Sequence, residues 1–587
     1  MPAFETVEHE VDFCVVGGGI AGLCAALAAA RHGLKVALMQ DRPMLGGNAS
    51  SEIRMWICGA HGEGNRETGI LEELTLENQY RNPLKNYSIW DSVLYGIARS
   101  EKNVILLLNC SCLDAKMDKE RIVSICGWQT TTQRYHRVKA KLFADCSGDS
   151  ILAPLTGAQF RMGRESRKEF DESITPEQAD SKTMGMNCLM QAEEMPFDVP
   201  YTAPRWSECV TKEKLTYRMP DMSDVRENFW YLELGGQRNS IADTEELRDE
   251  LLALNYGFWD YIKNDPEQKE KHARWALSWM GMLPGKRESR RYVGAYILTE
   301  RDIEQGGHFE DIVAYGGWTM DDHHPSGFRT KDRPNVFHPA PSPYGIPYRC
   351  LYSVNIQNLF FAGRNISVTH AAFSSIRVMA TCALCGQAAG TAAALAIHAG
   401  VMPSQVSVNR LQAELMRDDC YLPGKIRTIP KMTRDAALSG GGQNVQAVRD
   451  GIDRNLKGET HAWIGMRGDV LRYDFSSPVD VAGIRLVFDS DLERETFTEE
   501  EQIIGTAMFC NRRLVTPLAH PPKTLIRRFR IKGIFADRRE VFLLEEKENY
   551  QRFRVYEMCH TGLTSIIFEP LETWGADDFR VFGFEVE

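Results

Sequence analysis

The chain begins with an apolar segment that leads into a stretch rich in small residues. Residues 11–16 read Val-Asp-Phe-Cys-Val-Val, and an Ala-rich helix is expected over about residues 20–32. A second apolar segment, residues 35–39, follows directly. Strand, helix and strand at this spacing are typical of a βαβ unit in a parallel sheet.

Later segments differ in pattern. The alternation of strands and helices is lost between about residues 165 and 345, where Trp, Tyr, Arg and Pro become frequent, and we assign this stretch to a substrate-facing domain. The apolar run 379–397 contains Gln387 and many Ala and Gly residues, so it predicts a buried helix and no membrane span. A polar helix is expected over residues 408–417, before a glycine-rich break at 439–444.

The C-terminal part has the pattern of a β structure. Its apolar or alternating segments are separated by turn residues, and they are residues 470–475, 481–488, 527–531 and 581–586. This pattern predicts a β-sandwich. The segments 445–453, 462–465 and 473–475 resemble discoidin-like, galactose-binding jelly rolls, which bind sugars or serve as lids and subunit contacts.

The turn between the first strand and helix has the spacing G-x-G-x-x-G, formed by Gly17, Gly19 and Gly22. The first glycine permits a tight turn, the second lets the backbone approach a pyrophosphate, and the third lets the helix pack closely on the sheet. The helix N-terminus favours negative charge. The strand before it and the helix after it supply the context that this motif requires, so we predict a bound dinucleotide.

The end of the second strand is where a dinucleotide's ribose is commonly held. The sequence there reads Gln40, Asp41, Arg42, and either of the first two side chains could hydrogen-bond the ribose hydroxyls. A second glycine cluster follows, and its candidate contacts are Gly46, Gly47, Asn48 and Ser51. A simple NAD domain does not need this second cluster.

These features resemble FAD-dependent oxidoreductases with a glutathione-reductase-like flavin domain, in the group that includes fumarate reductase flavoproteins. Four blocks carry the resemblance: residues 15–22, 45–52, 142–149 and 358–364. Within that group the chain is most similar to the family called FAD-dependent oxidoreductases, on the added segments 287–291, 344–349 and 375–379. It departs from the wider pattern at Gln40, and at Arg364, where many relatives have Asp.

The resemblance implies FAD as the cofactor and adds five contacts to those above: Gly148, Gly363, Arg364, Ser375 and Ile376. The fold class expected is α/β, with a Rossmann-like FAD-binding domain, an inserted α+β substrate domain and a C-terminal all-β jelly-roll-like sandwich. The expected boundaries are 1–165 and 346–405 for the FAD-binding domain, 166–345 for the substrate-facing domain, 406–440 for a helical linker and 441–587 for the sandwich. No metal site is predicted.

Composition narrows the functional classes. A chain of 587 residues implies two or more domains, and a net charge of -11 without a basic block argues against nucleic acid or an anionic membrane as partner. The N-terminus lacks the pattern of a signal peptide, so a cytoplasmic protein is expected. The 15 cysteines have no framework and indicate reduced thiols, including the C-x-x-C pair Cys382 and Cys385. A homo-oligomer is left open.

A second G-x-G-x-x-G motif is not seen in the sequence, so nicotinamide is not the default electron partner, and the acceptor or donor is left unknown. We favour oxidation of a secondary alcohol of a sugar, glycoside or polyol by hydride transfer to flavin N5. A base must take the hydroxyl proton, and the candidates are His370, His61 and His324. Arg291, Arg377 and Tyr348 are candidate orienting groups.

Two other functions stay open. In one, reduced flavin delivers a hydride to an activated C=C bond, as in fumarate-reductase-like enzymes, and Arg291 or Arg377 binds a carboxylate. In the other, the chain is a carbohydrate-binding protein with a non-catalytic flavin. The sequence does not choose the substrate or the direction of electron flow.

Overall fold

The computed structural model describes residues 4–492 and 508–587. Its contacts divide the chain into two compact units that interleave along the sequence. Within the described residues, the first unit comprises 4–60, 85–411 and 508–517, and the second comprises 61–84, 412–492 and 518–587. Each unit is therefore built from segments that lie far apart in the sequence.

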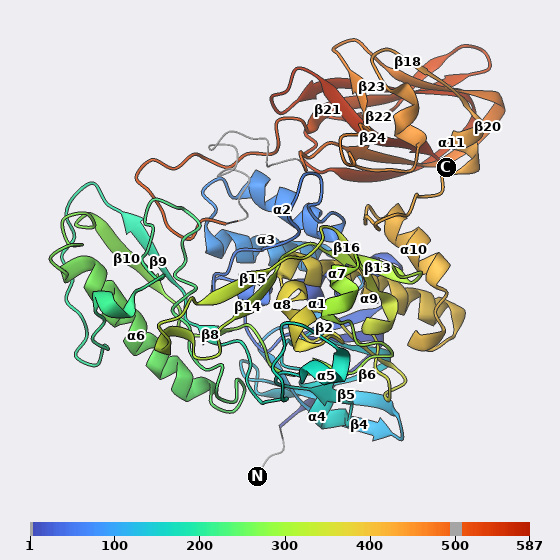
Figure 1. The fold of residues 1–587 in the computed structure, drawn as a ribbon. Coiled ribbons are helices and arrows are strands. Elements are labelled where there is room, and N and C mark those ends of the chain that lie inside the picture. The colour runs from blue at the N-terminus through green and yellow to red at the C-terminus, as the bar shows by residue number, and fades with distance from the viewer. Residues whose placement is uncertain (1–3, 493–507) are drawn as a thin grey trace. The chain divides into compact units, whose positions relative to one another are not determined.

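A mostly parallel sheet forms the centre of the first unit (Figure 1). Its parallel strands lie in the order β3, β2, β1, β6 and β17. Their bounds are β1 Thr6–Val16, β2 Val36–Met39, β3 Val104–Leu107, β6 Arg134–Asp145 and β17 Leu359–Phe361. The antiparallel strands β4 (Cys110–Asp118) and β5 (Arg121–Gln129) extend the sheet from β6. This confirms the predicted α/β class, and the parallel strands end on the same edge, where such folds bind ligands.

Helix α1 (Ile20–Arg31) follows β1, as the βαβ pattern predicts. It packs against α9 (Met379–Ala399), which is the apolar helix predicted from residue 379 onward. A Cβ on Gly386 would lie 2.1 Å from the carbonyl oxygen of Ala21, and one on Gly390 would lie 2.2 Å from that of Ala25. The two backbones therefore touch only because both positions are glycine. Helix α9 is long and apolar enough to cross a membrane, and 89% of its most apolar window is buried within the fold.

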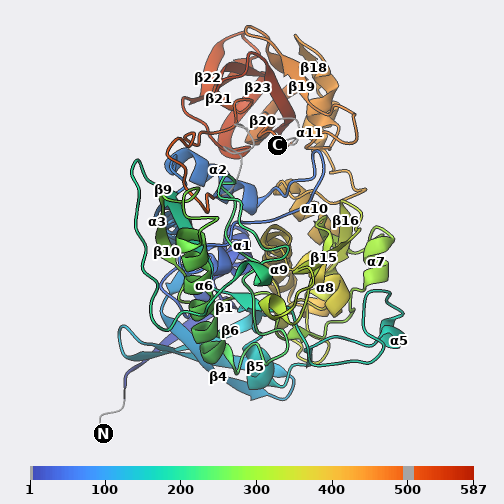
Figure 2. The ribbon, with the colours of Figure 1, turned by 60° about the vertical axis from the view of Figure 1, so that its left-hand side comes forward.

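The inserted region has one long helix and several short hairpins. Helix α6 (Thr244–Asn264) lies beside the hairpin of β9 (Met190–Glu194) and β10 (Trp275–Met280), as Figures 1 and 2 show. A hydrophobic cluster that includes Leu251, Phe258 and Trp275 joins them. The sequence analysis did not predict α6.

The other helices of at least four residues in the first unit are α3 Tyr87–Ser100, α4 Leu152–Thr156, α5 Arg167–Phe170, α7 Glu300–Glu304 and α8 His370–Ile376. The remaining strands are β7 Phe160–Arg161, β8 Met186–Asn187, β11 Gly285–Lys286, β12 Arg291–Tyr292, β13 Ile312–Gly316, β14 Met320–His323, β15 Asn335–His338 and β16 Tyr344–Pro347.

The second unit is an antiparallel β-sandwich, as the C-terminal pattern predicts. Its strands are β18 Ala437–Gly440, β19 Trp463–Gly465, β20 Leu471–Phe488, β21 Ile526–Phe535, β22 Glu540–Glu546, β23 Phe553–Thr573 and β24 Phe579–Val586. Two segments expected as separate strands, 470–475 and 481–488, form the single strand β20, whose pairing with β23 shifts register three times. Such shifts let one strand bend and continue.

Helices α2 Ile70–Arg81 and α11 Lys431–Asp435 belong to the second unit, and α10 Val408–Arg417 spans the boundary in the sequence between the two units. Helix α10 has the bounds predicted for the polar helix, with its last residues in this unit. Helix α2 comes from the N-terminal half of the sequence, and its Tyr80 ring stacks on Tyr550 with centroids 3.9 Å apart. The sandwich unit therefore includes a helix that lies outside residues 441–587.

The close contact between α1 and α9 gives a first prediction. Gly386→Ala should destabilise the protein by about 1–3 kcal/mol, because the new methyl group overlaps the backbone of α1. Gly96→Ala in α3 is the matched control, because nothing lies within 4 Å of a Cβ at that position and alanine favours helix. Thermal unfolding of both variants measures the effect. Equal melting temperatures for the two would contradict the packing described here.

Candidate functional site

Three glycines shape the turn between β1 and α1, and glycine is present at each position for a different physical reason. Gly17 has a φ of 101°, and a Cβ there would lie 2.5 Å from the backbone of Cys146 and Ser147. A Cβ on Gly22 would lie 1.8 Å from the carbonyl oxygen of Gly17. Packing inside the protein therefore requires glycine at both positions.

Gly19 is different, because protein packing does not explain it. A Cβ there would meet only the Cα of Gly47, at 3.9 Å, and Gly19 lines the cavity described below. The second glycine loop faces it, since the N–H of Gly46 donates to the carbonyl oxygen of Gly18 at 2.8 Å. Gly46 and Gly47 have φ values of 104° and 60°. The two loops form a backbone cradle that is open at Gly19.

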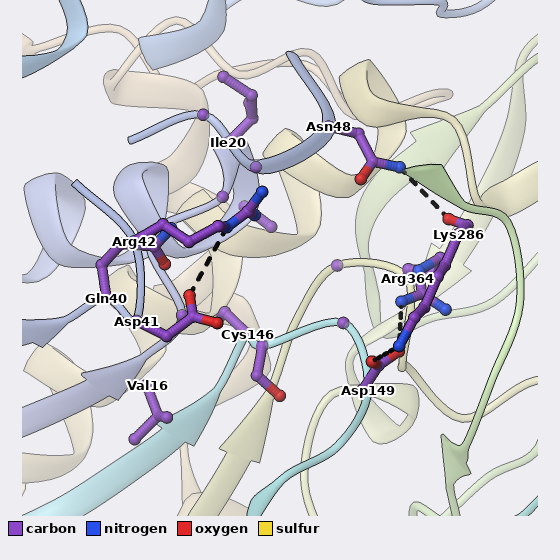
Figure 3. Close-up of a pocket in the computed structure, with 18 of the residues that line it drawn as sticks. Val16, Ile20, Gln40, Asp41, Arg42, Asn48, Cys146, Asp149, Lys286 and Arg364 are labelled. Carbon is purple, nitrogen blue, oxygen red and sulfur yellow. Dashed lines mark hydrogen bonds and ion pairs between the residues drawn. The ribbon is translucent and has the colours of Figure 1, made fainter. Parts of the chain in front are cut away.

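A cavity of about 400 Å³ lies at the carboxyl ends of β1, β2, β6 and β17 (Figure 3). The segments that line it are 16–21, 39–42, 46–48, 110–112, 146–149, 283–286, 363–364 and 377–382, not every residue of each taking part. All four sequence blocks predicted for the cofactor therefore meet at this cavity. Most of the predicted cofactor contacts lie in the wall of this cavity. They are Gly17, Gly19, Gln40, Asp41, Arg42, Gly46, Gly47, Asn48, Gly148, Gly363 and Arg364.

Gln40 lines the cavity, but its side chain serves the protein. Its Oε1 accepts from the N–H of Gly18 at 2.6 Å, and its Nε2 donates to the carbonyl oxygen of Met44 at 3.1 Å. The side chain is buried and joins the two glycine loops. Asp41, in contrast, is largely exposed, with its carboxylate 3.7 Å from Nε of Arg42. Asp41 is therefore the better placed of the two for a ribose, and Gln40 fixes the cradle.

Asp145, the last residue of β6, organises the loop that follows this strand. Its buried carboxylate accepts from the N–H groups of Ser147 and Leu152 and from the hydroxyl of Tyr292, at 2.6–2.9 Å. It also accepts from Nδ2 of Asn365, just after β17, at 3.2 Å. Burial raises the pKa of Asp145, and the hydrogen bonds oppose that rise.

A cluster of ion pairs forms another part of the cavity wall. The carboxylate of Asp149 lies 2.6 Å from Nζ of Lys286 and 2.8 Å from Nη2 of Arg364, as Figure 3 shows. Burial alone would raise the pKa of Asp149, but the two cations outweigh it and hold that pKa well below its usual range. Arg364 also donates to Oγ of Ser289 at 3.0 Å. The inserted region thus contributes a lysine to the cavity wall.

The flavin end of the site differs in detail from the expectation. Ser375 and Ile376 were predicted as cofactor contacts, but they lie in α8, which ends at Ile376, and α9 begins only at Met379. Ser375 is buried, and its hydroxyl bonds to the carbonyl oxygen of Trp318 and the hydroxyl of Tyr344. The cavity is instead lined by Arg377, Met379 and Cys382. Ser51, also predicted as a contact, uses its N–H to bind the carboxylate of Asp91.

Arg377 is the charged side chain at this end of the cavity. Its Nη2 donates to Oδ2 of Asp321 at 3.0 Å. Its Nε is buried and has no hydrogen-bond partner within the described part of the chain. A buried N–H without a partner costs free energy.

His370, a candidate base, is held between two carboxylates. Its Nδ1 lies 3.0 Å from Glu288 and its Nε2 lies 3.3 Å from Asp322. Burial alone would lower its pKa, but the two acids outweigh it and raise the pKa to about 10. The imidazole is therefore a cation at neutral pH and cannot accept the proton of an alcohol. The hypothesis that His370 is the base loses its physical support.

The remaining predicted residues are placed away from the cavity wall. Arg291 is fully buried, and its guanidinium contacts Glu165, Glu288 and two backbone carbonyls. The hydroxyl of Tyr348 donates to the carbonyl oxygen of Pro403 at 2.7 Å. His324 is partly exposed, and its Nδ1 accepts from the N–H of Ser326 at 3.2 Å. His61 is exposed and belongs to the second unit.

Three residues of the site were not singled out from the sequence. They are Asp149, Lys286 and Asp321, whose contacts join segments of the chain more than 50 residues apart. The sequence analysis named His324 as a candidate, but the buried histidine next to Asp321 and Asp322 is His323.

The cysteines around the cavity are unreactive. All fifteen, each within the described residues, have free thiols. Burial raises the pKa of Cys382 to about 12, so its thiol stays protonated at neutral pH. The C-x-x-C pair lies inside α9, as expected for a packing role.

The cavity residues fit FAD. The open cradle at Gly19 and the N-terminus of α1 suit a pyrophosphate, and Asp41 suits the adenosine ribose. Arg42 and Arg364 add positive charge along the cavity.

The open cradle gives a second prediction. Gly19→Ala should leave the stability of the FAD-free protein unchanged but weaken FAD binding by about tenfold or more, because its methyl group occupies the space of the pyrophosphate. Gly22→Ala, whose Cβ overlaps the backbone, should impair folding itself. Flavin absorbance of the purified proteins and thermal unfolding separate the two effects. FAD binding of wild-type strength in Gly19→Ala would disprove this assignment.

The charge of His370 gives a third prediction, with a defined sign. Because its folded-state pKa is raised from 6.5 to about 10, the imidazolium stabilises the fold fully below the lower value, and this contribution is lost as pH rises through the upper one. His370→Gln should therefore cost about 3–5 kcal/mol at about pH 6, with the deficit shrinking by about pH 10. Thermal unfolding across this range, with His324→Gln as the exposed control, measures it. A deficit that does not change with pH would refute the charged state.

Short segments of the chain are similar to known oxidoreductases. A segment of 102 residues is 32% identical to NADH:acrylate oxidoreductase of Vibrio harveyi, covering 16% of this chain and 10% of that protein. A segment of 71 residues is 35% identical to glycerol-3-phosphate dehydrogenase of Mycobacterium leprae, covering 12% of each protein. The chain thus matches only about a tenth of the length of these curated relatives.

Among solved structures, the family 32 carbohydrate-binding module of Streptococcus pneumoniae EndoD aligns with 27% of this chain and 97% of its own, at 9% identity and a TM-score of 0.20. The sequence profile described as FAD dependent oxidoreductase matches residues 12–415, which include every wall of the cavity. The protein therefore belongs to the family of FAD-dependent oxidoreductases and is an enzyme that uses FAD.

Proposed function

We propose that this enzyme oxidises a secondary alcohol of a sugar, glycoside or related polyol. The observation that carries the proposal is Arg377, a cationic side chain that lines the cavity and is held in place by the carboxylate of Asp321. A fixed donor of this kind can hold a hydroxyl oxygen. It binds that oxygen more strongly as negative charge develops on it.

FAD, when bound, supplies the acceptor for the hydride that leaves the alcohol carbon. The protein must orient the substrate and take up the hydroxyl proton. Arg377 is proposed to orient the hydroxyl with its guanidinium group, which the contact of Nη2 with Asp321 holds in place. A guanidinium does not accept protons at neutral pH, so the acceptor must be another group.

Asp321 is proposed as that acceptor. Its carboxylate is the ion partner of Arg377, and its Oδ1 accepts from Nδ2 of Asn335 at 2.5 Å. A substrate hydroxyl on Arg377 would thus lie beside an ionised carboxylate that is held in a fixed orientation. Neither His61 nor His324 is needed in this arrangement.

One of the matched relatives supports an alcohol as the substrate. One matched relative is named a glycerol-3-phosphate dehydrogenase, and its name describes oxidation of a polyol phosphate. The electron acceptor that reoxidises the enzyme is not proposed.

Reduction of an activated C=C bond is a second candidate. The cationic Arg377 lines the cavity, which suits a reductase that binds a carboxylate. Another matched relative is named NADH:acrylate oxidoreductase.

The idea of a carbohydrate-binding protein with a non-catalytic flavin conflicts with membership of an oxidoreductase family. The free thiols support a reducing compartment, and we propose the cytoplasm.

Anaerobic titration of the FAD-loaded protein distinguishes the two reactions. Sugars, glycosides and polyols are added to the oxidised protein, and unsaturated carboxylates are added after chemical reduction. Bleaching of the flavin absorbance by a polyol supports the alcohol dehydrogenase. Reoxidation by an unsaturated acid, with no bleaching by any polyol, would reject it in favour of the reductase.

Arg377 gives the fourth prediction. Arg377→Gln should slow flavin reduction by the substrate about 100-fold, because the donor to the developing oxyanion loses its charge and position. Arg226→Gln, a change at an exposed ion pair, is the matched control and should react at the wild-type rate. FAD content, measured by absorbance, should be unchanged in both variants. Loss of FAD from Arg377→Gln would assign this arginine to the cofactor and remove it from the substrate.

A further inference from the structure

Residues 283–286 bring the inserted region to the wall of the cofactor cavity. Leu283, Pro284 and Lys286 line the cavity directly. Lys286 is the second residue of β11, which pairs with β8 of the same inserted region. We call residues 283–286 the clasp, because their contacts reach two loops of the FAD-binding domain.

Lys286 contacts both of these loops. Its carbonyl oxygen accepts from Nδ2 of Asn48, in the second glycine loop, at 3.3 Å. Its Nζ donates to Oδ2 of Asp149, in the loop after β6, at 2.6 Å. Figure 3 shows Asn48, Lys286 and Asp149 along the same side of the cavity. One residue of the inserted region therefore joins two loops that line the cofactor cavity.

The clasp is anchored more firmly to its own region than to the FAD-binding domain. The side chains of Lys286 and Asp149 are 16% and 29% exposed, and ion pairs that water reaches are weaker than fully buried ones. The hydrogen bond from Asn48 is long, and the remaining contact is the packing of Gly285 on Ile53. The pairing of β11 with β8, in contrast, lies within the inserted region. Opening the clasp breaks few contacts.

The ammonium of Lys286 already has a partner within the protein. Each carboxylate oxygen of Asp149 has its own cation, Lys286 on Oδ2 at 2.6 Å and Arg364 on Oδ1 at 2.8 Å. Oγ of Ser289 also donates to Oδ1, and Arg290 donates to the backbone carbonyl oxygen of Asp149. A charge-assisted hydrogen bond this short fixes the position of the lysine side chain. Its charge therefore serves to hold the wall closed.

We infer that Lys286 retains the cofactor, because its ion pair with Asp149 closes the clasp beside bound FAD and slows the release of FAD. This inference rests on FAD as the cofactor and does not depend on the proposed oxidation. The cavity residues fit FAD, and the clasp is part of the wall of the same cavity. FAD leaves faster when the wall beside it opens more often. Retention of the cofactor is thereby controlled from the inserted region.

The fifth prediction tests this role by substitution. Lys286→Met keeps a side chain of similar length but removes the ammonium, so FAD should leave about tenfold faster, since the loss of a contact acts mostly on the dissociation rate. The loaded protein is diluted and filtered at intervals, and the flavin absorbance that stays with the protein gives this rate. Lys182→Met is the matched control and should release FAD as wild type does. Lys182 is an exposed lysine of the inserted region, with its ammonium 3.8 Å from Asp180.

A second variant separates the clasp from simple attraction between charges. Asp149→Asn removes the carboxylate charge that holds Lys286, so it should also release FAD faster. The double variant should be no faster than the faster single variant, because both substitutions break the same contact. Slower release from Asp149→Asn would overturn the inference, because it would show that the cations act by attracting the phosphates. Release of FAD from Lys286→Met at the wild-type rate would overturn it as well.

A second measurement needs no variant. Amide hydrogen exchange of the wild-type protein is compared with and without FAD, and the N–H groups of residues 283, 285 and 286 should exchange more slowly when FAD is bound. Exchange that FAD leaves unchanged would overturn the inference, even where Lys286→Met fails to fold. If no polyol bleaches the flavin, the proposed oxidation fails, and these two measurements still decide the role of Lys286.

Discussion

The buried carboxylate of Asp145 is the interaction on which the cavity depends. It stands at the end of β6, between β1 and β17, and its acceptor sites are used by Ser147, Leu152, Tyr292 and Asn365. These partners come from the loop after β6, from the inserted region and from the segment after β17. A buried carboxylate is stable only if it is fully hydrogen-bonded, so the same energy that offsets its desolvation fixes three walls of the site.

That arrangement explains why the glycine positions are not equivalent. Gly17 must be glycine because the loop held by Asp145 passes 2.5 Å from its missing Cβ. Gly19 faces open space, and glycine there makes sense only with a ligand in the cavity. A motif read from sequence treats the three glycines alike. The structure separates those that serve folding from the one that serves binding.

Local pattern was enough to predict the βαβ unit, the polar helix 408–417, the apolar helix α9 and the C-terminal sandwich, because each depends on the periodicity of its own residues. It did not predict α6, and it treated Gln40 as a ribose ligand. The role of Gln40 depends on Gly18 and Met44 together, which no spacing in the sequence reveals. Asp149 and Lys286 were missed for the same reason, since their pairing joins residues 137 positions apart.

The two buried histidines near α8 show why residue type alone could not identify a base. Each lies between two carboxylates, yet their compensating cations differ. Glu288 shares a single arginine, Arg291, with Glu165, so the cluster around His370 needs the imidazolium charge. The carboxylates beside His323, in contrast, each have an arginine partner of their own, because Arg287 pairs with Glu233 and Arg377 pairs with Asp321. A proton acceptor is useful only where the charge that it gains is not already demanded by its neighbours. On that argument the balance of nearby charges, rather than the presence of a histidine, decides which side chain can take part in the redox step.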